Sequence, residues 1–128
     1  MTWRWLSKAA TLAFHEEQIG EHGGAFGVRD LGLLESALAR PENLAAYGDP
    51  DAADLAAAYA FGIAKNHPFV DGNKRTAAVL METFLDLNGQ ELTADDASLV
   101  VVVLALAAGD MSEAELTQWL RENLKPLA

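Results

Sequence analysis

The amino-acid pattern predicts an all-α protein, a compact single-domain bundle of about six helices. The 128 residues suit one domain, spanning residues 1–128, and they contain no internal repeat or linker. Hydrophobic residues make up 51% of the chain and charged residues 22%, which is enough apolar surface for a core and argues against disorder. Helix-capping residues precede most of the apolar segments, and no segment has convincing strand character.

The first two predicted helices cover residues 8–21 and 31–39. Ser7 can accept a hydrogen bond from the first turn of the earlier helix, and a connection rich in glycine follows it. Asp30 is a similar cap for the second, shorter helix. We expect this helix to end before Pro41, because the residue that precedes a proline avoids helical geometry.

The third and fourth predicted helices flank a short loop. The third begins at Asp51 or Asp54 and carries apolar residues every four positions until Pro68 stops it. Asn73 opens the fourth, which runs to about Leu87 before a glycine closes it. The middle of this helix is apolar on all sides, so we expect it to be the buried central helix.

The last two predicted helices end near residues 108 and 123. Thr93 with Asp96 resembles a capping box, and Ser112 with Glu115 repeats the pattern. The valines at 100–103 favour a strand by propensity, but the caps and the length of the segment predict a helix.

Composition excludes several classes of protein. A formal net charge of −10 opposes general binding of nucleic acid. The absence of cysteine excludes disulfides and thiolate metal sites. The longest apolar run, residues 99–108, is too short to span a bilayer and is expected to be a buried segment. The first ten residues lack the apolar core of a signal peptide, and we expect a cytoplasmic protein without membrane contact.

The few basic residues are unevenly distributed. The chain contains nine lysines and arginines, and Lys65, Lys74 and Arg75 all fall within residues 65–75. Asn73, Lys74 and Arg75 lie on the first turn of the fourth helix, where free backbone N–H groups and the helix dipole attract anions. Gly72 has no side chain to keep an anion away from these groups. We therefore predict a phosphate cradle at residues 72–75.

Further residues of the same loop are suited to phosphoryl chemistry. His67 is a candidate general base, because the ordinary pKa of histidine lies near neutrality. Asp71 can supply a hard oxygen ligand to Mg²⁺ beside bound phosphates. Lys74 and Arg75 can neutralise charge on a transferred phosphoryl group. Phe69 is expected to anchor the loop in the core.

An ordinary structural interpretation of these residues stays open at this point. A histidine before a proline can simply terminate a helix, and Asp, Gly and Asn are common turn residues. Lysine and arginine at a helix start can be solvated. The other histidines, His15 and His22, are interpreted as surface or capping residues. We interpret the tryptophans as packing residues: Trp3, Trp5 and Trp119.

Residues 67–75, with the sequence HPFVDGNKR, resemble the active-site motif of the Fic/Doc family, which begins His-x-Phe-x-Asp/Glu-Gly/Ala-Asn. Residues 27–41 resemble the flap region of Doc-type members, and the resemblance covers nearly the whole chain. It implies a Fic/Doc-like helical fold with a flap at about residues 23–41 and an active-site loop at 67–75. Arg29, in the flap, is a candidate contact to the target, or a partner for a carboxylate.

Two positions bear on the type of reaction. Family members that transfer AMP usually have glycine where Lys74 stands and a second arginine where Ala78 stands. The resemblance to Doc instead implies a protein kinase that uses ATP with Mg²⁺ and belongs to a toxin-antitoxin system. The implied acceptor is a hydroxyl of elongation factor Tu, so that translation is blocked. Transfer of AMP, or an inactive module that only binds an antitoxin, are the alternatives.

Control by a separate protein is also expected. Some Fic proteins carry an inhibitory helix with the pattern Ser/Thr-x-x-x-Glu-Gly/Asn, and this chain lacks the pattern. The resemblance to Doc implies a small antitoxin whose disordered C-terminal segment folds into a helix on the toxin. The predicted helix at residues 100–106 and the first helix are candidate walls for the groove that would bind it.

Overall fold

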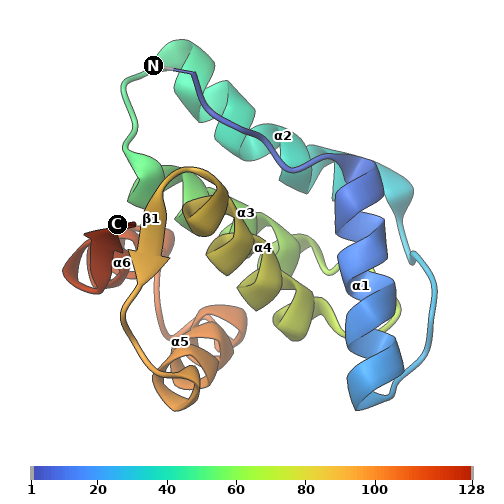
Figure 1. Cartoon of the computed structure of the whole chain (residues 1–128). Coiled ribbons are helices and arrows are strands. Elements are labelled where there is room, and N and C mark those ends of the chain that lie inside the picture. The colour runs from blue at the N-terminus through green and yellow to red at the C-terminus, as the bar shows by residue number, and fades with distance from the viewer. Residues whose placement is uncertain (1, 128) are drawn as a thin grey trace.

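The computed structural model describes residues 2–127 and confirms the all-α class (Figure 1). The six helices are α1 (Lys8–His22), α2 (Leu31–Tyr47), α3 (Ala52–Asn66), α4 (Asn73–Leu87), α5 (Asp96–Ala108) and α6 (Glu113–Glu122). No helix within residues 2–127 is long and apolar enough to cross a membrane.

The expectation that the chain forms no strand was wrong at two places. The short strands β1 (Gln90–Leu92) and β2 (Leu124–Pro126) pair antiparallel, with Glu91 opposite Lys125. Each strand has three residues, which is too short to leave an alternating hydrophobic pattern in the sequence. The pairing brings the C-terminal end of the domain back to the turn that follows α4.

Helix α3, rather than α4, is the central helix, so that prediction was wrong (Figure 1). It packs against α2, α4, α5 and α6, and ten of its 15 residues are buried. Most of these residues are alanine, and their small side chains allow the neighbouring helices to approach closely. A methyl group added at Gly62 would lie only 3.1 Å from the Cα of Ala37 in α2. Helix α4 leaves Lys74 and Glu82 exposed on one side.

Two predicted helix boundaries also need correction. Helix α2 continues through Pro41 to Tyr47, because Pro41 is buried and the following turn packs Ala45 against the core. That burial offsets the backbone hydrogen bond that the proline cannot donate. The cap of α5 is Asp95, whose side chain accepts from the Ser98 amide at 2.8 Å. Thr93 instead donates its hydroxyl and its amide to the Asn123 carbonyl, next to the β1–β2 pair.

Helix α5 is buried on one side only, which corrects the expectation of a buried segment at residues 99–108. Leu99, Val102, Val103 and Leu106 face the core. Val100, Val101 and Leu104 are 56%, 65% and 48% exposed, so an apolar face of α5 remains in contact with solvent.

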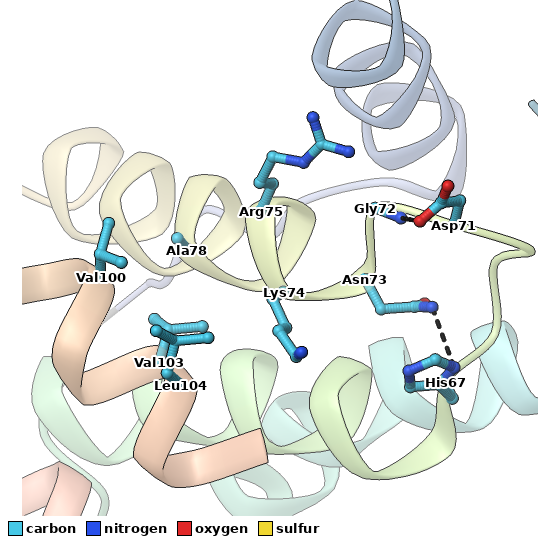
Figure 2. Close-up of a pocket in the computed structure, with 10 residues that line it drawn as sticks. All are labelled: His67, Asp71, Gly72, Asn73, Lys74, Arg75, Ala78, Val100, Val103 and Leu104. Carbon is cyan, nitrogen blue, oxygen red and sulfur yellow. Dashed lines mark hydrogen bonds between the residues drawn. The ribbon is translucent and has the colours of Figure 1, made fainter. Parts of the chain in front are cut away.

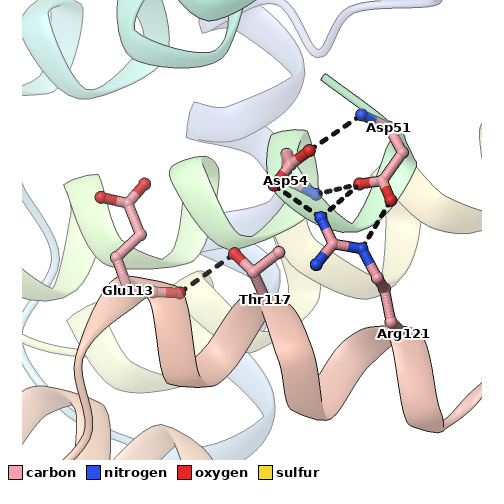
Figure 3. A network of polar contacts seen from close by, with 5 residues as sticks. All are labelled: Asp51, Asp54, Glu113, Thr117 and Arg121. Carbon is pink, nitrogen blue, oxygen red and sulfur yellow. Dashed lines mark hydrogen bonds and ion pairs between the residues drawn. The ribbon is translucent and has the colours of Figure 1, made fainter. Parts of the chain in front are cut away.

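Charged side chains join α6 to the start of α3 (Figure 3). Asp51 caps α3 in a capping box with Asp54. Of the two predicted starts, Asp51 is therefore confirmed. Arg121 of α6 binds both carboxylates, at 2.7 Å and 2.9 Å. Burial raises the pKa of Asp51, but the hydrogen bonds from Arg121 and from the Asp54 amide outweigh this and lower it below its ordinary value. These contacts hold α6 against the central helix α3.

Candidate active site

The loop between α3 and α4 begins with a strained residue. His67 ends α3 with φ 52° and ψ 53°, the left-handed region, and is the one non-glycine residue with positive φ within residues 2–127. Its amide still bonds to the Ile63 carbonyl at 3.1 Å, so the helix is complete up to this point. The side chain of His67 is exposed, and buried Pro68 then directs the chain away from the helix axis.

The part of the predicted flap that precedes α2, residues 23–30, lies against this loop. Val28 and Phe69 form an isolated antiparallel bridge, and the Val70 amide donates to the Gly27 carbonyl at 3.0 Å. Arg29 donates its side chain to the carbonyl oxygens of Asn66 and His67, both at 2.8 Å. The guanidinium of Arg29 therefore caps the C-terminal end of α3, and its contact with a target stays a prediction.

Asn73 organises the loop from inside. It is 3% exposed, and its Oδ1 accepts from the Phe69 amide at 3.0 Å while its Nδ2 donates to the Phe69 carbonyl at 3.0 Å. These two bonds fix the orientation of the amide group. The second hydrogen of Nδ2 then points at Nδ1 of His67, 3.1 Å away (Figure 2). A neutral His67 ring that accepts at Nδ1 carries its own proton on Nε2.

His15 is a site residue that the sequence analysis missed, and its assignment to the surface was wrong. It is 2% exposed and stacks on buried Phe69, with ring centroids 3.8 Å apart and an interplanar angle of 7°. Its Nε2 lies 2.7 Å from the Asp71 carbonyl oxygen, so it donates a hydrogen bond to the loop. The available signal was the four-residue spacing of Thr11, His15 and Ile19, which together form the buried stripe of α1.

Asp71 and Arg75 face α1 and the flap. Asp71 accepts from its neighbour Gly72 at 3.0 Å and from the Ala25 amide at 3.3 Å. Arg75 donates to the Gly23 carbonyl at 3.0 Å, near the end of α1. Lys74 leaves α4 on the opposite side from Arg75 and is exposed (Figure 2). The two predicted phosphate-binding cations thus stand on either side of the α4 N-terminus.

The N-terminus of α4 has no side-chain cap. Gly72 occupies the cap position with φ 77°, and a side chain there would come within 2.9 Å of Ile19. The other helices of the described chain all begin with a side chain that accepts from the first turn: Ser7, Asp30, Asp51, Asp95 and Ser112. The first-turn amides of α4 therefore remain available to an external anion.

The loop, α4 and α5 line an open cavity of about 370 Å³ (Figure 2). Its lining comprises His67, Asp71, Gly72, Asn73, Lys74, Arg75, Ala78, Val100, Val103 and Leu104. Six of these come from the predicted loop, so the structure places the predicted site residues around one space. Phe69 is buried in the core and does not line the cavity, as expected of an anchor for the loop. Within the described residues, no group of three His, Asp or Glu side chains can hold a metal ion by itself.

This arrangement of helices and loop defines a member of the Fic/DOC family: the family model described as "Fic/DOC family" matches residues 5–85, so the chain belongs to that family. Two curated relatives carry Doc names. "Toxin Doc" of Mycolicibacterium smegmatis is 50% identical over 76 residues, which cover 57% of this chain and 58% of that protein, less than two thirds of its length. "Protein kinase doc" of Escherichia phage P1 is 31% identical over 119 residues, which cover 92% of this chain and 94% of that protein.

Proposed function

We propose that the chain is a Doc-like toxin that transfers the γ-phosphoryl group of ATP to a hydroxyl of a protein. The observation that carries the proposal is the uncapped N-terminus of α4, which opens into the same cavity as His67. Anion-binding amides next to a titratable imidazole are what phosphoryl transfer requires from a protein: positioning and charge stabilisation beside a proton acceptor.

The phosphates would bind at the first turn of α4. Its free amides point outward from the helix end, and Lys74 adds an ammonium group on the exposed side. Arg75 already donates to the Gly23 carbonyl, but a guanidinium has five N–H donors, so donors remain for a phosphate oxygen. The contact with Gly23 holds the guanidinium in place before the substrate arrives.

Asp71 fits the role of ligand to a substrate-bound Mg²⁺. It is the one carboxylate among the residues that line the cavity. Mg²⁺ in such sites is held by one or two carboxylates together with phosphate oxygens and water, so a three-residue cluster is not required. The two amides bound to Asp71 leave further lone pairs on its oxygens. A bound Mg²⁺ would neutralise charge on the phosphates.

His67 would accept the proton of the acceptor hydroxyl. The basic lone pair of its neutral ring is on Nδ1, where it accepts the hydrogen bond from Asn73 at 3.1 Å. Because the side chain is exposed, the ring can turn about its Cβ–Cγ bond and present Nδ1 to the hydroxyl. As the O–H bond breaks toward His67, the hydroxyl oxygen bonds to the γ-phosphorus and the bond to the leaving ADP breaks.

Transfer of the γ-phosphoryl group rather than AMP is proposed because of Lys74 and Ala78. Ala78 lies one turn beyond Lys74, where family members that transfer AMP usually have an arginine for the outer phosphate, and its methyl group cannot bind one. The acceptor we propose is elongation factor Tu, following the resemblance to Doc. The alternatives are AMP transfer to a protein hydroxyl and an inactive module that binds only its antitoxin.

We propose further that a separate antitoxin restrains the protein. Helices α1 and α5 both pack against α4, and α5 exposes Val100, Val101 and Leu104. An antitoxin helix could bury this apolar face, as helix-in-groove recognition requires.

Labelled ATP tests the reaction type. The protein is incubated with a bacterial lysate and either γ-labelled or α-labelled ATP, and labelled proteins are identified. We expect label from the γ position alone, lost in His67→Ala and kept in His22→Ala, which changes an exposed histidine on the surface of α1. Label from the α position would establish AMP transfer instead, and no label from either would favour the binding module.

A further inference from the structure

The segment that follows α1, Gly23-Gly24-Ala25, contacts two charged side chains of the candidate site. The Gly23 carbonyl accepts from the Arg75 guanidinium at 3.0 Å. The Ala25 amide donates to Oδ2 of Asp71 at 3.3 Å. A carbonyl oxygen thus meets the cation and an N–H group meets the anion, so each charge is bonded to a neutral backbone group of matching polarity.

Asp71 and Arg75 carry opposite charges and are potential partners for each other. Both side chains face α1 (Figure 2), and they contact residues of one short segment, in which consecutive Cα atoms are about 3.8 Å apart. A guanidinium and a carboxylate readily form a bidentate pair. Among the ion pairs of residues 2–127, however, none joins these two side chains. Their bonds to residues 23–25 are therefore made in place of a direct ion pair.

Gly24 leaves the space in which the Asp71 carboxylate lies. A methyl group added at Gly24 would be 2.8 Å from Oδ2 and 3.1 Å from Cγ of Asp71, distances at which the carboxylate must move. The backbone φ of Gly24 is 118°, a value that glycine adopts without a steric cost. The chain therefore has its smallest residue at the point where the segment passes closest to the carboxylate.

We propose that Gly23-Gly24-Ala25 is a positioning segment that keeps Asp71 and Arg75 apart as two separate charges. The inference rests on the proposed function, in which Asp71 binds Mg²⁺ and Arg75 binds a phosphate oxygen. An ion pair between them would occupy the carboxylate lone pairs and the guanidinium donors that these ligands need. Neutral backbone groups instead orient each side chain without cancelling its charge.

Gly24→Ala tests the separation. Its methyl group should displace the Asp71 carboxylate from the Ala25 amide, and the carboxylate should then pair with Arg75. If thermal melts show that Gly24→Ala is unfolded, Ala25→Pro answers the same question. Proline replaces the amide hydrogen that binds Asp71 with a ring carbon, so the carboxylate loses the same bond.

Gly27→Ala is the matched control for backbone strain. Gly27 lies in the same connection between α1 and α2 and has the same φ of 118°. A methyl group at this position would be an ordinary 3.7 Å from Val70 and would not approach Asp71. An effect of Gly24→Ala that Gly27→Ala lacks therefore comes from the contact with the carboxylate.

Binding of inorganic tripolyphosphate to the full chain, with metal ions chelated, measures whether Arg75 is free. Gly24→Ala should weaken this binding about tenfold, because one charge-assisted hydrogen bond to the anion is lost, and Gly27→Ala should leave it unchanged. Adding Asp71→Asn to Gly24→Ala should restore the affinity, since an amide cannot form an ion pair with Arg75. The same double variant should not regain Mg²⁺-dependent binding of a non-hydrolysable ATP analogue, which needs the carboxylate. A double-mutant cycle gives the coupling between the two positions.

Three results would overturn the inference. Equal affinity of Gly24→Ala and Gly27→Ala for tripolyphosphate would show that Arg75 stays free when the carboxylate is displaced. A loss that Asp71→Asn does not restore would show distortion of the segment rather than pairing. Both of these results leave the phosphate cradle intact. Failure of the unchanged protein to bind either tripolyphosphate or the ATP analogue would reject the cradle, and the proposed function together with this inference.

Discussion

The left-handed conformation of His67 gives a prediction about stability. With φ 52°, its Cβ crowds the neighbouring carbonyl, and a non-glycine residue in this region costs about 1–2 kcal/mol. Glycine avoids this cost because it has no Cβ. We expect His67→Gly to be more stable than His67→Ala, although glycine normally destabilises a folded protein relative to alanine.

The two variants lose the same side-chain interactions of His67. Each removes the imidazole and its 3.1 Å contact with Asn73, so the difference between them isolates the backbone strain. After the greater unfolded-state freedom of glycine is subtracted, about 1 kcal/mol in favour of His67→Gly remains. For a domain of this size that difference corresponds to about 3–5 °C in the melting temperature.

Urea unfolding of both variants measures the difference directly, since their transitions should have the same slope and different midpoints. Neither variant should transfer label from ATP, so both can be compared without toxicity. A His67→Ala protein that is as stable as His67→Gly, or more stable, would refute the reasoning and show that the loop relaxes without cost.

Three further predictions concern other contacts. His15→Phe keeps the ring stack on Phe69 but removes the hydrogen bond to the Asp71 carbonyl, so Mg²⁺-dependent nucleotide binding should weaken severalfold. The control His22→Phe should leave nucleotide binding unchanged, and equal binding by both variants would contradict the positioning role of His15. Gly62→Ala should destabilise the fold by about 1–3 kcal/mol, because the new methyl group would lie 3.1 Å from α2, whereas Gly20→Ala in open space should stabilise α1; thermal melts compare them. Burial raises the pKa of Tyr59 to about 12 from 10.0. The stability contributed by its neutral hydroxyl is therefore complete below pH 10 and is lost as the pH rises through about 12. Unfolding measured across this pH range should show the loss in the wild type and not in Tyr59→Phe.

The features that sequence analysis found are those set by neighbours in the chain. The capping residues Ser7, Asp30 and Ser112 each accept a hydrogen bond from an amide three residues later. The starts of these helices are therefore determined by neighbouring residues and can be predicted from the sequence. The phosphate cradle is equally local, since a glycine before a helix start and two following cations fall within four positions. The resemblance to the Fic/Doc motif added the class of reaction to this local pattern.

The features that it missed depend on residues far apart in sequence. His15 is buried because Phe69 and Asp71, more than 50 positions later, close over it. Helix α2 runs through Pro41 because tertiary burial outweighs a local rule about proline. The valines of α5 do not reveal which of them meet the core, because all have the same hydrophobicity.

The long-range construction of the cavity has a consequence during protein synthesis. A ribosome synthesises a chain from its N-terminus, so α1 and the flap emerge first. The loop at 67–75 emerges later, and α5, which carries the cavity residue Leu104, emerges later still. Until α5 has emerged, a nascent chain has the motif but lacks one wall of the cavity beside it. If the finished protein stops translation, its own growing copies would remain harmless to the ribosomes that make them, and inhibition would begin only with complete molecules.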